Sequence, residues 1–253
     1  MKLFSSRWFA AACTALVVSN AAPAAEPAMI AKARAYVGSE AALAAVTSVR
    51  YAGTLVTADP ADPANQTRAA MEIIFQKPDQ QRVVATSDKT VEVTALDGYD
   101  GWQRVTDLAD RTKWRQTLLG TEHIRRLRAN TWENMSFFRG LEGAGGRLED
   151  HGITTIDGIT CRKIAFVHAP QIVFNRFFDV ATGRLVYTET EAGGTIREQG
   201  EMIVNGIRFP KSIVTTTRNQ AGQLQTVTIH FEKITVNERF PASTFAVPSL
   251  MER

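Results

Sequence analysis

The feature that most constrains this chain is a succession of short segments in which apolar and polar residues alternate. Residues 49–56 and 71–75 follow this pattern, whose period of two is that of a β-strand with one buried face. Tight-turn sequences separate the segments, among them Asp157-Gly158, Gly193-Gly194 and Asn205-Gly206. Strands joined by such short turns pair antiparallel, because a parallel return needs a crossover of about a dozen residues.

Two segments break the strand pattern. In residues 27–46 the apolar side chains recur three and four positions apart, which predicts a helix with an interruption at Gly38-Ser39. Residues 117–141 have the same spacing and predict a second helix. The arginines of its basic cluster, residues 123–128, fall off the apolar stripe. They form either a solvated helix face or a surface that attracts anionic headgroups.

Together these segments predict a mainly β protein of the α+β class. A single antiparallel sheet of about ten to twelve strands must curl, and we expect a strongly curved, open half-barrel. The N-terminal helix and the mid-chain helical insertion are expected to cover its concave face. In the last strand the apolar residues change phase near Glu232-Lys233, which predicts a β-bulge. No linker divides residues 26–253, so we expect one domain.

Residues 1–25 have the order of a secretory signal peptide. A short basic start precedes an apolar run over residues 9–18, and small residues follow the run. The run is too short to span a bilayer as a helix, which takes about 20 residues. We therefore expect cleavage near Ala24 or Ala25 and export to the periplasm.

Residues that could carry chemistry are sparse. The net charge of +3 is a small excess, so we predict no nucleic-acid partner. The four histidines show no metal-ligand spacing, and the sequence contains no lipase-type nucleophile motif or phosphate-binding loop. After cleavage Cys161 is the one cysteine, which leaves no disulfide within the chain. We predict no catalytic residue, no metal and no cofactor, and a protein that is not an enzyme.

Four segments follow one another between Leu148 and Pro248: LEDHGITTIDGITCRKIAF, FFDVATGRLVYTE, GEMIVNGIRFPKSI and GQLQTVTIHFEKITVNERFPASTFAVP. In order and spacing they resemble the LolA-like superfamily of periplasmic lipoprotein carriers, or outer-membrane lipoprotein-sorting proteins. In that family a DG hairpin precedes a strand, a D-x-x-T-G turn and a G-x-x-F-P strand follow, and an F-x-x-P terminus closes the chain. The opening EAALAAVTSVRYAGTLV is similar to the family's first helix and strand, although VRYAGTL stands where the dedicated carriers have F-x-A-x-F-x-Q.

The resemblance implies an incomplete antiparallel barrel whose hollow holds the acyl chains of a lipidated protein. For this chain it implies a hydrophobic ligand, such as a lipid or an acylated lipoprotein, and a role as a carrier to the outer membrane. Such a carrier would make transient contact with a membrane or a membrane-bound partner.

In a half-barrel of this kind, alternate strand residues line the cavity together with side chains of the mid-chain helix. We predict the ligand-binding residues to be Tyr51, Leu55, Ile73, Phe75, Val93, Trp132, Met135, Phe138, Phe174, Ile213, Ile229 and Phe231. For the helix residues among them, packing in a closed core is an equal alternative. Two other functions remain open: a cell-envelope interaction protein with a packed cavity and a protein partner, and an unrecognised hydrolase.

Overall fold

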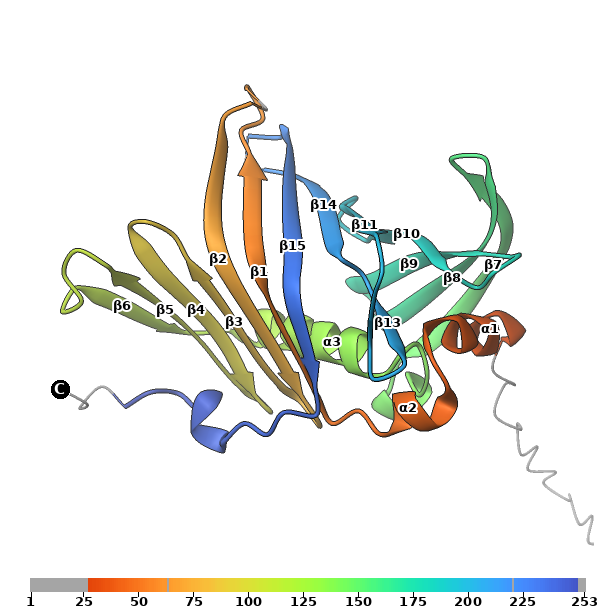
Figure 1. Cartoon of the computed structure of the whole chain (residues 1–253), viewed down its shortest axis with the longest axis horizontal. Coiled ribbons are helices and arrows are strands. Elements are labelled where there is room, and N and C mark those ends of the chain that lie inside the picture. Colours follow the sequence, from red (N-terminus) through yellow and green to blue (C-terminus); the bar gives the residue numbers. More distant parts are fainter. Residues whose placement is uncertain (1–26, 63, 220, 250–253) are drawn as a thin grey trace, which may run out of the picture.

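The computed structural model describes residues 27–62, 64–219 and 221–249, so the expected signal peptide and its cleavage site lie outside the described residues. Within these residues, thirteen antiparallel strands form one sheet in the order β6-β5-β4-β3-β2-β1-β15-β14-β11-β10-β9-β8-β7 (Figure 1). They are β1 (Ser48–Ala58), β2 (Gln66–Gln76), β3 (Gln80–Thr86), β4 (Thr90–Asp97), β5 (Asp100–Asp107), β6 (Trp114–Leu118), β7 (Arg147–Ile156), β8 (Ile159–Ala169), β9 (Ile172–Asp179), β10 (Leu185–Thr190), β11 (Thr195–Gln199), β14 (Ser212–Arg218) and β15 (Leu224–Val236). A separate hairpin contains β12 (Met202–Val204) and β13 (Ile207–Phe209).

The sheet curves strongly and does not close, because β6 and β7 are its two edges. The predicted mainly β, open half-barrel is therefore confirmed, with more strands than expected. The sequence pattern predicts single strands over residues 195–204 and 207–217, and each of them is broken into a pair. Gly200, with a φ of 64°, separates β11 from β12, and Pro210 separates β13 from β14. The third additional strand is β6, whose last two residues, Thr117 and Leu118, fall within the segment predicted as the mid-chain helix.

Three helices accompany the sheet: α1 (Ala28–Val37), α2 (Glu40–Ala44) and α3 (Thr121–Met135). Two short 3-10 helices, η1 (Glu142–Ala144) and η2 (Ala242–Thr244), follow in the chain. The expected interruption of the first helix is confirmed. Gly38 ends α1, and the Ser39 hydroxyl accepts a hydrogen bond from the Ala42 amide at the start of α2 (3.2 Å). The mid-chain helix is shorter at both ends than the predicted residues 117–141.

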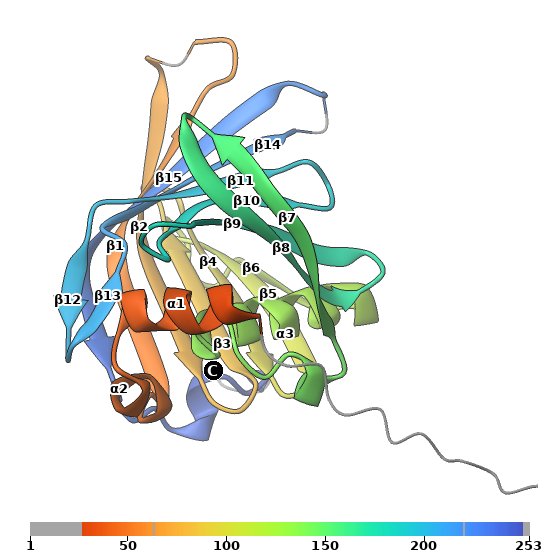
Figure 2. The same cartoon turned by 90° about the vertical axis from the view of Figure 1, so that its right-hand side faces the viewer.

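The position of α3 follows from the strand order. The chain begins in the middle of the sheet with β1, reaches one edge with β6, and resumes at the other edge with β7. The intervening α3 therefore crosses the hollow, where it packs on β2 to β5. Figure 2 shows α3 and α1 lying within the curve of the sheet. The chain returns to the middle with β15, which pairs with β1.

The predicted bulge is present where β1 meets β15. Ala52 lies opposite Lys233 and Gly53 lies opposite Phe231, so that Glu232 is the extra residue. At Gly53 the backbones approach so closely that an added Cβ would lie 1.9 Å from the His230 carbonyl oxygen. Only glycine fits this position without a shift of the partner strand.

Two buried clusters flank the hollow. The first joins α2 to the middle of the sheet and contains Leu43, Val46, Val49, Tyr51, Phe75, Met135, Phe137, Ile207, Phe209, Phe231 and Ile234. The second joins α1 to β8 and β9 and contains Met29, Ile30, Ala33, Leu141, Ile164, Phe166 and Phe178. The end of α3 and the residues after it contribute to both clusters, so the helix is anchored between them.

The substitution Gly53→Ala should lower the free energy of unfolding by more than about 2 kcal/mol, because the new methyl group must displace the β15 backbone. Urea denaturation measures this change. Gly143→Ala is the control, since an added Cβ there meets nothing within 4 Å and should leave stability nearly unchanged. Equal stability of the two variants would contradict the assigned bulge.

Candidate functional site

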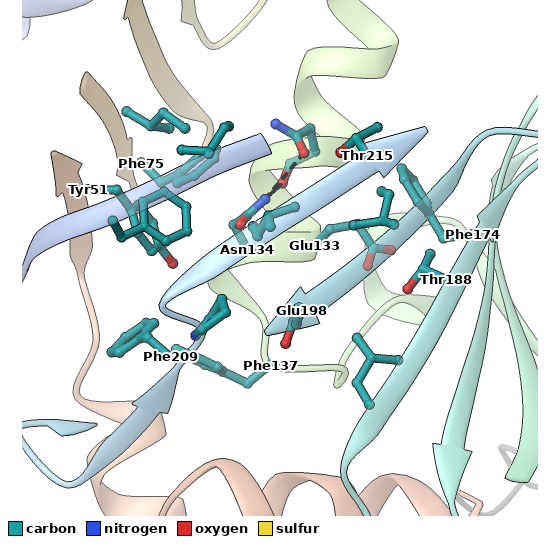
Figure 3. A pocket seen from close by; sticks show the side chains of 18 of the residues that line it. Tyr51, Phe75, Glu133, Asn134, Phe137, Phe174, Thr188, Glu198, Phe209 and Thr215 are labelled. Atoms are coloured by element: carbon teal, nitrogen blue, oxygen red, sulfur yellow. Dashed lines mark hydrogen bonds between the residues drawn. The ribbon is translucent and has the colours of Figure 1, made fainter. Parts of the chain in front are cut away.

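A cavity of about 320 Å³ lies between α3 and the concave face of the sheet (Figure 3). The strands in the middle of the sheet and the β13 segment give it an apolar wall: Tyr51, Ile73, Phe75, Val83, Phe209, Ile229 and Phe231. Polar side chains come from α3, from β9, β10, β11 and β14, and from β13: Asn130, Glu133, Asn134, Arg176, Thr188, Glu198, Thr215 and Arg208. The lining of the cavity is therefore apolar at the middle of the sheet and partly polar along α3 and strands β9 to β14.

The strand register explains which residues share the apolar wall. Tyr51 lies directly opposite Ile73, and Ile73 lies opposite Val83, so these three side chains point to the same face. Ile213 and Ile229 form a second such pair across β14 and β15. One alternating row of each strand therefore faces the hollow.

Eight of the twelve predicted ligand-binding residues line this cavity: Tyr51, Ile73, Phe75, Phe138, Phe174, Ile213, Ile229 and Phe231. Trp132 and Met135 instead line a separate pocket of about 430 Å³, together with Arg34 and Leu43. Whether any of these residues contacts a ligand stays a prediction.

Leu55 and Val93 lie outside the cavity. Val83 faces the cavity and pairs with Thr94, so Val93, the next residue along β4, points to the convex face. Val83 occupies the place expected for Val93. Leu55 shares the concave face with Tyr51 by alternation and lies opposite Ile229, but only Ile229 of this pair lines the cavity.

The face that α3 presents to the cavity differs from the predicted one. Asn130, Glu133 and Asn134 of α3 line the cavity with the spacing of one helix face, and Phe137, just after the helix, lines it too. The apolar stripe expected there packs elsewhere: Met135, for example, belongs to the cluster around Phe75. These polar residues are absent from the predicted lining, which contains almost only apolar side chains. Their helical spacing was the signal that could have revealed them.

Immediately after α3, two aromatic residues adopt left-handed backbone conformations. Phe137 has a φ of 50° and Phe138 a φ of 72°, and both line the cavity. Such conformations cost about 1–3 kcal/mol each at residues with a side chain. The buried Arg34 of α1 fixes this turn, because its Nη1 donates hydrogen bonds to the carbonyl oxygens of Ser136 (3.0 Å) and Phe137 (2.7 Å). Glu40 accepts from its Nε and Nη2 at 2.8 and 2.6 Å.

Arginines of α3 hold the helix to both sides of the sheet. Arg128 pairs with Asp79 (2.9 Å), in the turn between β2 and β3. On the other side, Arg126 pairs with Glu191 and donates a hydrogen bond to the Gln171 carbonyl oxygen (3.0 Å). Two arginines of the basic cluster are therefore committed to contacts within the protein, and the cluster is more than a solvated helix face.

A buried charge cluster lies where α3 meets β8 and β9. Glu133 and Arg176 form an ion pair, and the residues are 8% and 7% exposed. His168 Nε2 lies 2.6 Å from Glu133 Oε1. The Arg176 guanidinium lies over the rings of Phe138 and Phe166, 4.8 and 4.9 Å from their centres. Within the described part of the chain, Arg176 Nε and Nη1 have no hydrogen-bond partner.

Glu198 also lines the cavity, but unlike Glu133 and Arg176 it has no ion-pair partner in the part of the chain that the structure describes. Alternation along β11 places Ile196 and Glu198 toward the cavity, and Arg197 on the convex face, where it pairs with Asp157 (2.7 Å). Among the described residues, no hydrogen bond or ion pair joins the Glu198 carboxylate to the protein. Glu198 is exposed to water, and partial desolvation by the protein atoms around it raises the pKa of its carboxyl group. The nearby Arg176 charge acts in the opposite direction.

Tyr51 is the polar group on the apolar wall. Burial raises the pKa of its hydroxyl, and the negative charge of Glu198 raises it further. The ring packs among Phe75, Phe209 and Phe231, with ring centres 6.2, 5.9 and 4.8 Å away. Tyr51 is therefore neutral at physiological pH and rigidly held.

None of the helices in the described ranges is both long and apolar enough to span a membrane. Over residues 27–62, 64–219 and 221–249, no group of three or more His, Cys, Asp or Glu residues is arranged to hold a metal ion.

No protein-family model matches the chain, and no curated protein matches its sequence. Solved structures share its fold. A LolA superfamily protein from Nitrosomonas europaea has a TM-score of 0.56 at 12% identity, over 87% of this chain and 96% of that one. A putative outer membrane lipoprotein-sorting protein domain from Vibrio parahaemolyticus has a TM-score of 0.54 at 9% identity, over 86% and 94%. A DUF1329 family protein from Desulfovibrio piger has a TM-score of 0.54 at 10% identity, over 87% and 96%.

These likenesses define the class of the protein: its fold is LolA-like. The predicted resemblance is therefore confirmed at the level of the fold. At identities this low they establish the architecture alone.

Glu198→Gln should make the protein more stable than the native chain at pH 7.5 and equally stable well below pH 4.5, the ordinary pKa of a glutamate. A raised pKa means that the folded state binds the proton more tightly than the unfolded chain, so ionisation of Glu198 lowers stability as pH rises. Urea denaturation across this pH range measures the difference. Glu189→Gln, on the convex face of β10, should not reproduce it. A stabilisation by Glu198→Gln that is independent of pH would contradict the argument.

Arg176→Met should lower the free energy of unfolding by about 3 kcal/mol, because it leaves Glu133 buried without its cation. Glu133→Gln should also destabilise the protein. The double variant should lose less than the sum of the two single variants, since it leaves neither charge unpaired. Urea denaturation of all four proteins measures this coupling, and additive losses would show that the two side chains do not act as a pair.

Proposed function

We propose that this protein is exported to the periplasm and binds a hydrophobic ligand, the acyl chains of a lipid or of a lipidated protein, in the cavity beneath α3. The observation that carries the proposal is the cavity itself. A curved sheet covered by a helix encloses about 320 Å³ instead of packing shut. This volume lies at the lower end of the range of about 300–1,000 Å³ for ligand pockets.

The chemistry of the wall supports an alkyl chain as the ligand. Aromatic and branched aliphatic side chains form its apolar wall, among them Phe75, Ile229 and Phe231. Burial of each methylene group contributes about 0.8 kcal/mol, so a chain of moderate length supplies the binding energy without polar contacts. The open cavity also counts against an interaction protein whose interior is packed.

The carrier role and the compartment rest on the sequence. Residues 1–25 have the order of an export signal. The lipoprotein-sorting description of the Vibrio parahaemolyticus domain supports a carrier that moves its ligand toward the outer membrane, with transient contact at a membrane or a membrane-bound partner. We further propose that the protein has no catalytic activity, and that residues 26–253 act as one domain.

Two measurements test the binding proposal. Native mass spectrometry of protein purified from the periplasm should show lipid adducts, and dodecanol should displace a fluorescent hydrophobic probe from the delipidated protein. Ile229→Trp should weaken dodecanol binding at least about tenfold, because the indole occupies space within the cavity.

Val93→Trp is the matched control, since it introduces the same side chain on the convex face and should leave binding unchanged. The proposal is wrong if no lipid co-purifies and the native protein does not bind dodecanol. It is also wrong if both tryptophan variants bind dodecanol like the native protein.

A further inference from the structure

The charged side chains that line the cavity differ in whether they have an ion-pair partner. Glu133 forms an ion pair with Arg176. Arg208 pairs with Glu201 at 2.9 Å and donates a hydrogen bond to the Tyr36 carbonyl oxygen at 3.0 Å. Of the charged groups that line the cavity, within the ranges described, Glu198 alone has no ion pair or hydrogen bond. The cavity therefore presents one unmatched negative charge.

Glu198 also has a distinctive place. It lines the inner cavity and an outer pocket of about 450 Å³, which lies beside α1 and also includes Tyr36, Arg184 and Glu201. Phe138 and Phe209 line both spaces, so the two adjoin. In Figure 3, Glu198 projects between the aromatic wall at Phe209 and the polar side chains of α3. It stands where an apolar interior meets a polar mouth.

We propose that Glu198 makes this cavity selective for amphiphiles that carry a cationic amine. The inference rests on the proposed function, because the alkyl chain of such a ligand occupies the apolar cavity while its amine meets Glu198. An ionised carboxylate only accepts hydrogen bonds, so its natural partner is a donor, and a cationic donor forms the stronger, charge-assisted bond.

The arrangement of arginines favours an amine over an anionic headgroup. Arg176 is engaged with Glu133 and lies against two aromatic rings. Arg208 is engaged with Glu201. Arg184 lines the outer pocket but not the cavity, and it has no ion pair among the described residues. An anionic headgroup entering the cavity would meet the unmatched Glu198 and be repelled. An ammonium group would satisfy it.

Three ligands with the same alkyl chain test the inference: dodecylamine, dodecanol and dodecanoate. Their affinities are measured below their micellar concentrations by displacement of a fluorescent hydrophobic probe. The native protein should bind dodecylamine about tenfold more tightly than dodecanol, the ratio expected for one hydrogen bond to a charged group. It should bind dodecanoate more weakly than dodecanol.

Glu198→Gln keeps the shape of the side chain and removes its charge. This variant should bind dodecylamine and dodecanol equally, and its retained affinity for dodecanol shows that the cavity is intact. Glu189→Gln makes the same change of charge on the convex face of the adjacent strand and should keep the native preference.

The inference is overturned if the native protein binds the amine and the alcohol equally, or if Glu198→Gln keeps the preference for the amine. Either result, with dodecanol still bound, leaves the proposed function standing. Absence of binding by all three ligands would overturn the proposed function and the selectivity together.

Discussion

The structure depends on one topological constraint: the sheet is not closed, and the chain must pass from one of its edges to the other. The segment between β6 and β7 can make that passage over the concave face, and α3 does so. Contacts of Arg126 and Arg128 with opposite sides of the sheet fix the helix across the hollow. The cavity exists because a single helix of fifteen residues, with α1 beside it, cannot fill the concavity that thirteen strands enclose.

The hairpins, the bulge and the break between the first two helices could be predicted because each is determined locally. Gly38 and Ser39 end one helix and cap the next, and a change of phase in one strand marks the bulge near Glu232. The rotation of α3 could not be predicted in this way. An apolar stripe shows that a helix face is buried but not which neighbour buries it. Met135 packs among the residues of the first cluster, and the polar face with Asn130 and Asn134 turns to the cavity.

The charged contacts of the site could not be predicted from the sequence either, because they join residues that are far apart in the chain. Arg34 lies about a hundred residues before the Phe137 carbonyl group that it contacts. Its positive charge at the C-terminal end of α3 interacts favourably with the helix dipole, and its guanidinium satisfies the carbonyl groups of Ser136 and Phe137. This contact offsets part of the strain at the two left-handed phenylalanines. The left-handed turn places Phe137 and Phe138 in the wall of the cavity. An extended backbone would direct these side chains elsewhere.

The contacts that hold α3 in place differ along the length of the helix. Arg126 with Glu191 and Arg128 with Asp79 are partly exposed pairs, each of the kind that contributes about 0–1 kcal/mol. The deeper anchor, Arg34 with the turn after α3, is buried and lies at the other end of the helix. The ion pairs near the start of α3 therefore contribute less to stability than the buried contacts at its end.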